Sequence, residues 1–288
     1  MKMIAIDLDG TLLNQDSLIS PANAAAVREA QNQGILVTIA TGRAFYDVQE
    51  ICKQAGIVTP VIGANGATIH DEQGSPIHTE PMSRSKAMDV LAWLEEEQYY
   101  YEIMTDRAIY SPQNGHELMT IEMDRVLSSS PERSLQSLMH AAEKQYSQNG
   151  ITRIPSYRHL PTDVEIYNIL AFSFLEEKLA AGRSRYSQDS ELTMVVSADH
   201  NFEVEHPLAS KGHALSRLAD MHHIPLTEVM AIGDSYNDIS MMRIAGRSIA
   251  MGNAHQQIKD VCDMVTLTNQ ENGVAHAIRQ LLGSSMNI

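Results

Sequence analysis

Two aspartates near the amino terminus are the first side chains in the sequence with the types and the spacing for chemistry. Asp7 and Asp9 follow the apolar run at residues 3–6 and lead into Gly10 and Thr11. Two carboxylates this close raise each other's pKa unless a cation or hydrogen-bond donors lie nearby. The pair favours a site that holds a divalent metal and acts on a phosphate, against the simpler alternative of a solvated acidic turn. An EF-hand calcium loop fits poorly, because a strand-like run rather than a helix precedes the pair.

Three more groups of residues with useful chemistry lie at the ends of predicted strands or at the start of a predicted helix. They are Thr41–Gly42–Arg43, Lys211, and Asp234–Asn237–Asp238. The carboxyl ends of parallel strands meet at one edge of a sheet, so we expect these groups to lie together. Together they supply a nucleophile, metal ligands, phosphate donors and a cation, which is what phosphoryl transfer requires. The oxygen ligands suit magnesium.

Each group also has an ordinary structural explanation. Thr41 could cap the helix that follows it, and Lys211 could be a solvated surface lysine. Asp234 and Asp238 could stabilise a helix amino terminus through the helix dipole. The joint occurrence of the groups in one chain favours the functional interpretation.

The elements that must position these residues alternate between strand and helix. Apolar runs at 3–6, 35–40 and 60–62 predict buried strands, and helices are expected between them, one beginning after Ser20 and one over 45–55. The same alternation resumes after residue 207, with a strand at 229–232. This order predicts an α/β fold, a parallel sheet with helices on both faces.

The pattern changes in the middle of the chain. Residues 83–206 contain strands and helices without acidic or glycine groups at the strand ends. We therefore predict one domain from residues 1–82 and 207–288, interrupted by an inserted α+β domain at 83–206.

Composition excludes several classes of function. The 288 residues include 21 basic and 36 acidic side chains, so a net charge of −15 leaves no electrostatic surface for nucleic acid. The 2 cysteines are far apart, which argues against a zinc site or a disulfide framework. We expect no signal peptide, no membrane partner and a cytoplasmic location, because no long apolar stretch is present. The sequence leaves the oligomeric state open.

The four groups resemble the motifs of the haloacid dehalogenase (HAD) superfamily. The resemblance rests on Asp7–Leu8–Asp9–Gly10–Thr11, Thr41–Gly42–Arg43, Lys211–Gly212 and Gly233–Asp234–Ser235–Tyr236–Asn237–Asp238. The insert and the late Gly252–Asn253–Ala254 resemble the Cof-type sugar-phosphatase branch. The resemblance covers the whole chain. It implies a Rossmann-like core, an inserted α+β cap of the C2B type that sets substrate specificity, and Mg2+ as the cofactor.

The resemblance also implies the roles of the first motif and of the metal ligands. Asp7 would attack the phosphorus, and Leu8 would offer its backbone amide to the phosphate. Asp9 would protonate the leaving oxygen and then activate water. Asp7, the backbone carbonyl of Asp9, and Asp234 would bind the magnesium ion.

The remaining motifs would bind and balance the phosphate. The resemblance implies that Thr41, Gly42 and Asn237 bind it, and that Lys211 stabilises both the phosphate and the nucleophile. Asp238 would support the site from behind.

The sequence thus predicts a magnesium-dependent phosphatase for small phosphorylated metabolites, with sugar phosphates as the favoured class of substrate. One alternative is a phosphomutase or phosphotransferase on the same core. The other is a non-enzymatic receiver-like module in which a phosphorylated aspartate acts as a switch. Asp9 and the large insert argue against that switch, since it needs neither a general acid nor a substrate lid.

Overall fold

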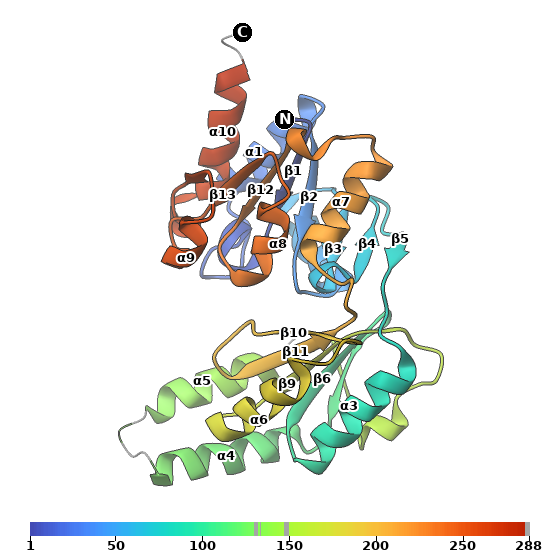
Figure 1. Ribbon diagram of the computed structural model, residues 1–288. Coiled ribbons are helices and arrows are strands. Elements are labelled where there is room, and N and C mark those ends of the chain that lie inside the picture. The colour runs from blue at the N-terminus through green and yellow to red at the C-terminus, as the bar shows by residue number, and fades with distance from the viewer. Residues whose placement is uncertain (130–131, 133, 147–149, 286–288) are drawn as a thin grey trace. The chain divides into compact units, whose positions relative to one another are not determined.

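The computed structural model describes residues 1–129, 132, 134–146 and 150–285. The chain divides into two compact units, which we call the core unit and the inserted unit. The core unit comprises Met1–Glu80 and Leu208–Ile288, and the inserted unit comprises Pro81–Pro207. Figure 1 shows that segments from both ends of the chain, blue to cyan and orange to red, build the core unit.

The core unit contains an 8-stranded sheet with the order β14-β13-β12-β1-β2-β3-β4-β5. The strands from β14 to β3 pair in parallel, whereas β4 and β5 add an antiparallel hairpin. Their bounds are β1 Met3–Ile6, β2 Leu36–Ala40, β3 Val61–Gly63, β4 Thr68–His70, β5 Pro76–Thr79, β12 Val229–Gly233, β13 Arg247–Ala250 and β14 Met264–Val265. The central strand β1 is fully buried, as its run of apolar residues predicts.

Helices cover both faces of this sheet (Figure 1). One face carries α1 (Pro21–Asn32), α2 (Phe45–Ala55) and α10 (Gly273–Ser285), whose apolar side chains form one hydrophobic cluster. The other face carries α7 (Lys211–Met221), α8 (Ile239–Met242) and α9 (Gln256–Lys259) in a second cluster. At the start of α1 the Ser20 hydroxyl accepts a hydrogen bond from the Asn23 amide at 3.1 Å, with Pro21 at the first helical position. The predicted α/β fold is confirmed.

The inserted unit contains a 6-stranded sheet with the order β10-β11-β9-β6-β7-β8. The bounds are β6 Tyr100–Thr105, β7 Ile109–Pro112, β8 Ile151–Ile154, β9 Ile166–Phe172, β10 Thr193–Val195 and β11 Asn201–Glu205. Helices α3 (Arg84–Glu96) and α6 (Glu176–Tyr186) pack on one face, and α4 (Gly115–Ser129) and α5 (Leu135–Tyr146) pack on the other. Within the described residues, none of the helices is both long enough and apolar enough to cross a bilayer.

Candidate active site

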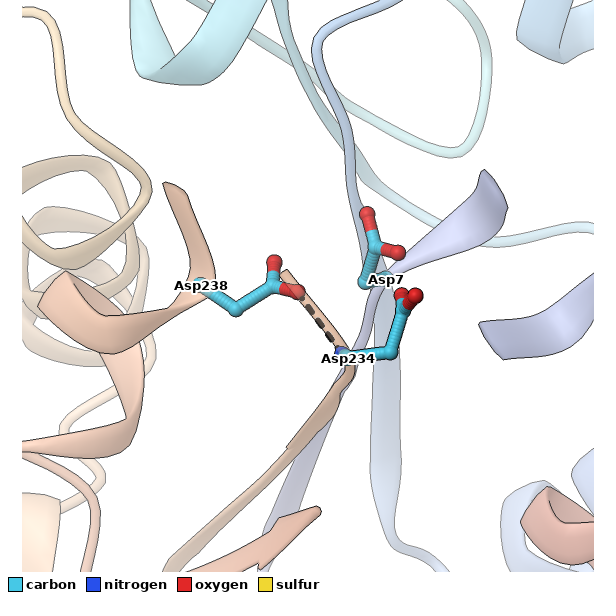
Figure 2. A group of neighbouring side chains, drawn as sticks. All are labelled: Asp7, Asp234 and Asp238. Atoms are coloured by element: carbon cyan, nitrogen blue, oxygen red, sulfur yellow. Dashed lines mark hydrogen bonds between the residues drawn. The ribbon is translucent and has the colours of Figure 1, made fainter. Parts of the chain in front are cut away.

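The candidate site lies in the core unit, at the carboxyl ends of β1 and β12. These two strands are neighbours, with Ile6 opposite Ile232, so the residues that follow them come together although they are far apart in sequence. Asp7 follows β1 directly, and Asp234 follows β12. Figure 2 shows the carboxylates of Asp7, Asp234 and Asp238 gathered at this edge of the sheet.

Lys211 is buried between two of these carboxylates. Its ammonium donates to Asp7 Oδ1 at 2.6 Å and to Asp238 Oδ1 at 2.7 Å. Lys211 is the first residue of α7, and only 1% of its surface is exposed. A solvated surface lysine is therefore excluded. A fully buried ammonium requires partners of this kind, because burying an unpaired charge is costly.

The carboxylates of the site are electrostatically crowded. Burial, followed by the negative charge of Asp238, raises the pKa of Asp7 well above its usual value. The same two causes, in the same order, raise the pKa of Asp234 to about 6. Burial disfavours the charged form of Lys211, but Asp238 and Asp7 together raise its pKa above the usual value. One lysine thus faces three carboxylates, and a divalent cation would relieve the remaining repulsion.

The donor set fits a metal ion with oxygen preference. Carboxylate oxygens of Asp7, Asp234 and Asp238 lie within 4.8 Å of one another. Both oxygens of Asp238 already accept hydrogen bonds: Oδ1 from Lys211, and Oδ2 from the amides of Asp234 at 3.0 Å and Ser235 at 2.9 Å. Asp7 and Asp234 are therefore better placed to ligate, while Asp238 holds their neighbours in position.

Capping and catalysis are not alternatives at Asp238. Ser235 and Asp238 form a reciprocal capping box at the turn Tyr236–Asp238, as the ordinary explanation expects. The other oxygen of the same carboxylate binds Lys211. A single side chain therefore fixes both the turn after β12 and the buried lysine.

Asp9 points to a different partner. Arg43 donates to both of its oxygens, from Nε at 2.8 Å and from Nη2 at 2.7 Å, and to Asp47 from Nη1 at 2.7 Å. These bonds raise the pKa of Arg43, first through the hydrogen bond to Asp9. The Asp9 side chain is 56% exposed, whereas Leu8 beside it is buried. In the structure, the Asp9 side chain is thus bound by Arg43 and is more exposed than the buried carboxylates of Asp7 and Asp238.

Thr41–Gly42–Arg43, the second of the four motifs, contacts the turn Ala64–Gly66 that follows β3. Thr41 is buried, and its hydroxyl accepts a hydrogen bond from the Arg43 amide at 3.2 Å. A side chain at Gly42 would come within 3.0 Å of Asn65 Oδ1. Asn237 donates from Nδ2 to that same oxygen at 3.1 Å. The structure therefore connects the second and fourth motifs through Asn65.

Two residues of the site have no role in the sequence-based prediction. Arg43 enters it only as part of its motif, and Asn65 does not enter it. Both lie just after predicted strands, at the sheet edge where the other candidate residues lie. An arginine or an asparagine at such a position is a usable signal, although its partners become visible only in the folded chain.

Comparison with known proteins defines the class. A family model for haloacid dehalogenase-like hydrolases matches residues 4–278, so the chain belongs to that family. Phosphatase YwpJ of Bacillus subtilis is 53% identical over 285 residues, which cover 98% of this chain and 100% of the relative. The 5-amino-6-(5-phospho-D-ribitylamino)uracil phosphatase YwtE of the same organism is 40% identical over 283 residues, with 98% of each chain covered.

A solved structure supports the same family assignment. A haloacid dehalogenase-like hydrolase from B. subtilis superposes with a TM-score of 0.85 at 52% identity, covering 98% of this chain and 100% of that chain. The chain is an enzyme of the phosphatase class, a phosphoric monoester hydrolase. The predicted family and class of enzyme are confirmed.

Proposed function

We propose that this enzyme is a magnesium-dependent phosphatase that hydrolyses small phosphorylated metabolites through an aspartyl-phosphate on Asp7. Sugar phosphates are the favoured class of substrate. The observation that carries the proposal is the position of Asp7. This carboxylate is buried at the edge of a parallel sheet, 2.6 Å from the Lys211 ammonium and beside Asp234. Such an arrangement supplies a nucleophile, a cation and a ligand pair in one place.

Mg2+ would be held by Asp7, Asp234 and the backbone carbonyl of Asp9, and when bound it would neutralise charge on the phosphate. Lys211 keeps Asp7 oriented and balances part of its charge. Thr41, Gly42, Asn237 and the backbone amide of Leu8 would bind the phosphate oxygens, and Asp238 would support the site.

The reaction would proceed in two displacements. An oxygen of Asp7 attacks phosphorus, the bond from phosphorus to the leaving oxygen breaks, and Asp9 gives that oxygen its proton. Asp9 then takes a proton from water as the water oxygen attacks phosphorus. Inorganic phosphate leaves, and the Asp7 carboxylate is restored. For this chemistry Asp9 must release Arg43, because both Asp9 oxygens accept hydrogen bonds from it in the structure.

The substrate class follows from a relative and from the insert. The relative YwtE, at 40% identity, is named for a substrate that carries a phosphorylated ribityl chain. A phosphorylated sugar or sugar alcohol is therefore the first class to test for this chain. We assign the selection of that group to residues 83–206, which would form the substrate-specificity cap.

The test is release of inorganic phosphate from p-nitrophenyl phosphate and from a panel of sugar and sugar-alcohol phosphates, with magnesium or with EDTA. The expected result is release that requires magnesium and is fastest with members of the panel. Release that is unchanged by EDTA would contradict the metal requirement. Transfer of the phosphoryl group to an added sugar hydroxyl, instead of to water, would replace the proposal with a phosphotransferase on the same core.

A further inference from the structure

The turn Ala64–Gly66 after β3 has an energetically unfavourable backbone conformation. Ala64 and Asn65 adopt left-handed conformations with φ of 47° and 52°, and Gly66 follows at 104°. Left-handed φ is unfavourable for alanine, because its Cβ approaches the following carbonyl oxygen. A buried turn keeps such a conformation only where its surroundings fix it, and residues of this kind cluster at functional sites.

This turn contacts two of the motifs through its backbone. The amide of Asn65 donates to the Thr41 carbonyl at 2.9 Å, and the amide of Ala64 donates to the Arg43 carbonyl at 2.9 Å. Gly66 lies so close to the Ser210 carbonyl, directly before Lys211, that a Cβ at this position would collide with it. The turn therefore fixes the spacing between the second and third motifs.

The side chain of Asn65 reaches the fourth motif. Asn65 is only 3% exposed, and its Oδ1 accepts the hydrogen bond from Asn237 Nδ2 at 3.1 Å. That oxygen also faces Gly42, where any side chain would crowd it. An acceptor at this place decides which end of the Asn237 amide is turned toward Asn65, because only the nitrogen end can donate to it.

We infer that Asn65 is a positioning residue for phosphate binding, acting through Asn237. An amide nitrogen carries two N–H groups, so one can bind Asn65 while the other donates to a phosphate oxygen. Without Asn65 the Asn237 amide could turn and present its oxygen, which repels phosphate. The inference rests on the proposed function, since it concerns the same phosphate site.

The first test compares Asn65→Gly and Asn65→Asp with the wild-type enzyme. Glycine accepts a left-handed backbone and removes only the side chain. The Asn65→Gly substitution should lower both kcat/KM for p-nitrophenyl phosphate and the affinity for inorganic phosphate, measured with magnesium present. We expect a decrease of about tenfold, which is the upper end of the effect of losing one hydrogen bond. The melting temperature should stay close to the wild-type value. Aspartate keeps an acceptor and adds charge, so the side-chain amide proton signal of Asn237 should move downfield in Asn65→Asp, whereas it should move upfield in Asn65→Gly as the hydrogen bond is lost.

The second test is a double-mutant cycle with Asn237→Ala. If Asn65 acts through Asn237, adding Asn65→Gly to Asn237→Ala should cause no further loss of phosphate affinity. Losses that add in full would overturn the inference, because Asn65 would then act on its own. An Asn65→Gly enzyme with wild-type phosphate affinity and an unshifted Asn237 signal would overturn it as well.

Failure of the inference is distinct from failure of the proposed function. If the wild-type enzyme releases and binds phosphate and the Asn65→Gly enzyme behaves identically, that result contradicts the inference alone. A wild-type enzyme that neither releases phosphate from the panel nor binds inorganic phosphate contradicts the proposed function, and with it the inference.

Discussion

Replacing Lys211 with methionine should destabilise the core unit and abolish phosphate release. The lysine is 1% exposed and forms ion pairs with Asp7 and Asp238 at 2.6 and 2.7 Å. Methionine keeps much of the apolar stem but leaves both carboxylates without their cation. Removing one partner of a buried ion pair costs about 3–5 kcal/mol. For a unit of the size of the core unit, that loss corresponds to a drop in Tm of roughly 6–20 °C.

The loss should depend on pH in a defined direction. The raised pKa of Lys211 means that its stabilisation is present at every pH below its ordinary unfolded value and is lost only as the pH rises through the folded value. Asp7 has a raised pKa in the folded enzyme, so the folded state binds more protons than the unfolded state. Stability from this group therefore falls as pH rises. Without Lys211 this effect grows, and the variant should lose less stability at about pH 5 than at about pH 8.

Calorimetry of the metal-free proteins measures this effect, and the chain offers two controls. Its 1 tryptophan, Trp93, lies in α3, so tryptophan fluorescence follows the inserted unit separately. Lys2→Met removes an exposed ion pair with Glu228 and should change stability by about 1 kcal/mol or less. A Lys211→Met enzyme with the stability and pH dependence of the Lys2→Met control would refute the electrostatic account of the site.

Three further predictions concern the neighbouring residues. Magnesium affinity, measured by titration, should weaken as pH falls below about 6, because burial raises the pKa of Asp234 to about 6 and protons then compete with the metal. The Asp234→Asn enzyme should bind magnesium weakly at every pH. Gly10→Ala should abolish phosphate release, because φ is 76° and the new Cβ would collide with the Asp234 carboxylate, whereas the control Gly34→Ala at φ 79° has open space and should stay active. Arg43→Lys replaces the bidentate contact with Asp9 by a weaker one, so Asp9 should be released more readily; kcat for p-nitrophenyl phosphate should rise while KM changes little.

The elements of the core unit could be predicted because their signals are local. The apolar run at 3–6 is strand β1, and the helix expected over 45–55 is α2 with the same bounds. Ser20 caps α1 as its hydroxyl and the following proline indicate. Strand ends then place the candidate residues on one edge, which is why their proximity could be anticipated without the structure.

The contacts of charged side chains could not be predicted in this way. Burial of Lys211 depends on partners that lie 204 and 27 residues away in the sequence. In the inserted unit, Glu102, Glu203 and Glu205 are buried on strands β6 and β11, although glutamate is ordinarily exposed. No local pattern reports such burial, because it is decided by tertiary partners such as Asn168, which donates to Glu203 at 2.7 Å.

The most direct test of the account is to locate the phosphoryl group during turnover. Asp9→Asn enzyme is mixed with magnesium and p-nitrophenyl phosphate, whose leaving group departs without a general acid, and is then quenched in acid, digested and mapped by mass spectrometry. The account predicts a phosphoryl group on the peptide that contains Asp7, more abundant than in the wild-type enzyme, because the general base that activates water is missing. A phosphoryl group on another residue, or none on Asp7 while the wild-type enzyme turns over the same substrate, would contradict it.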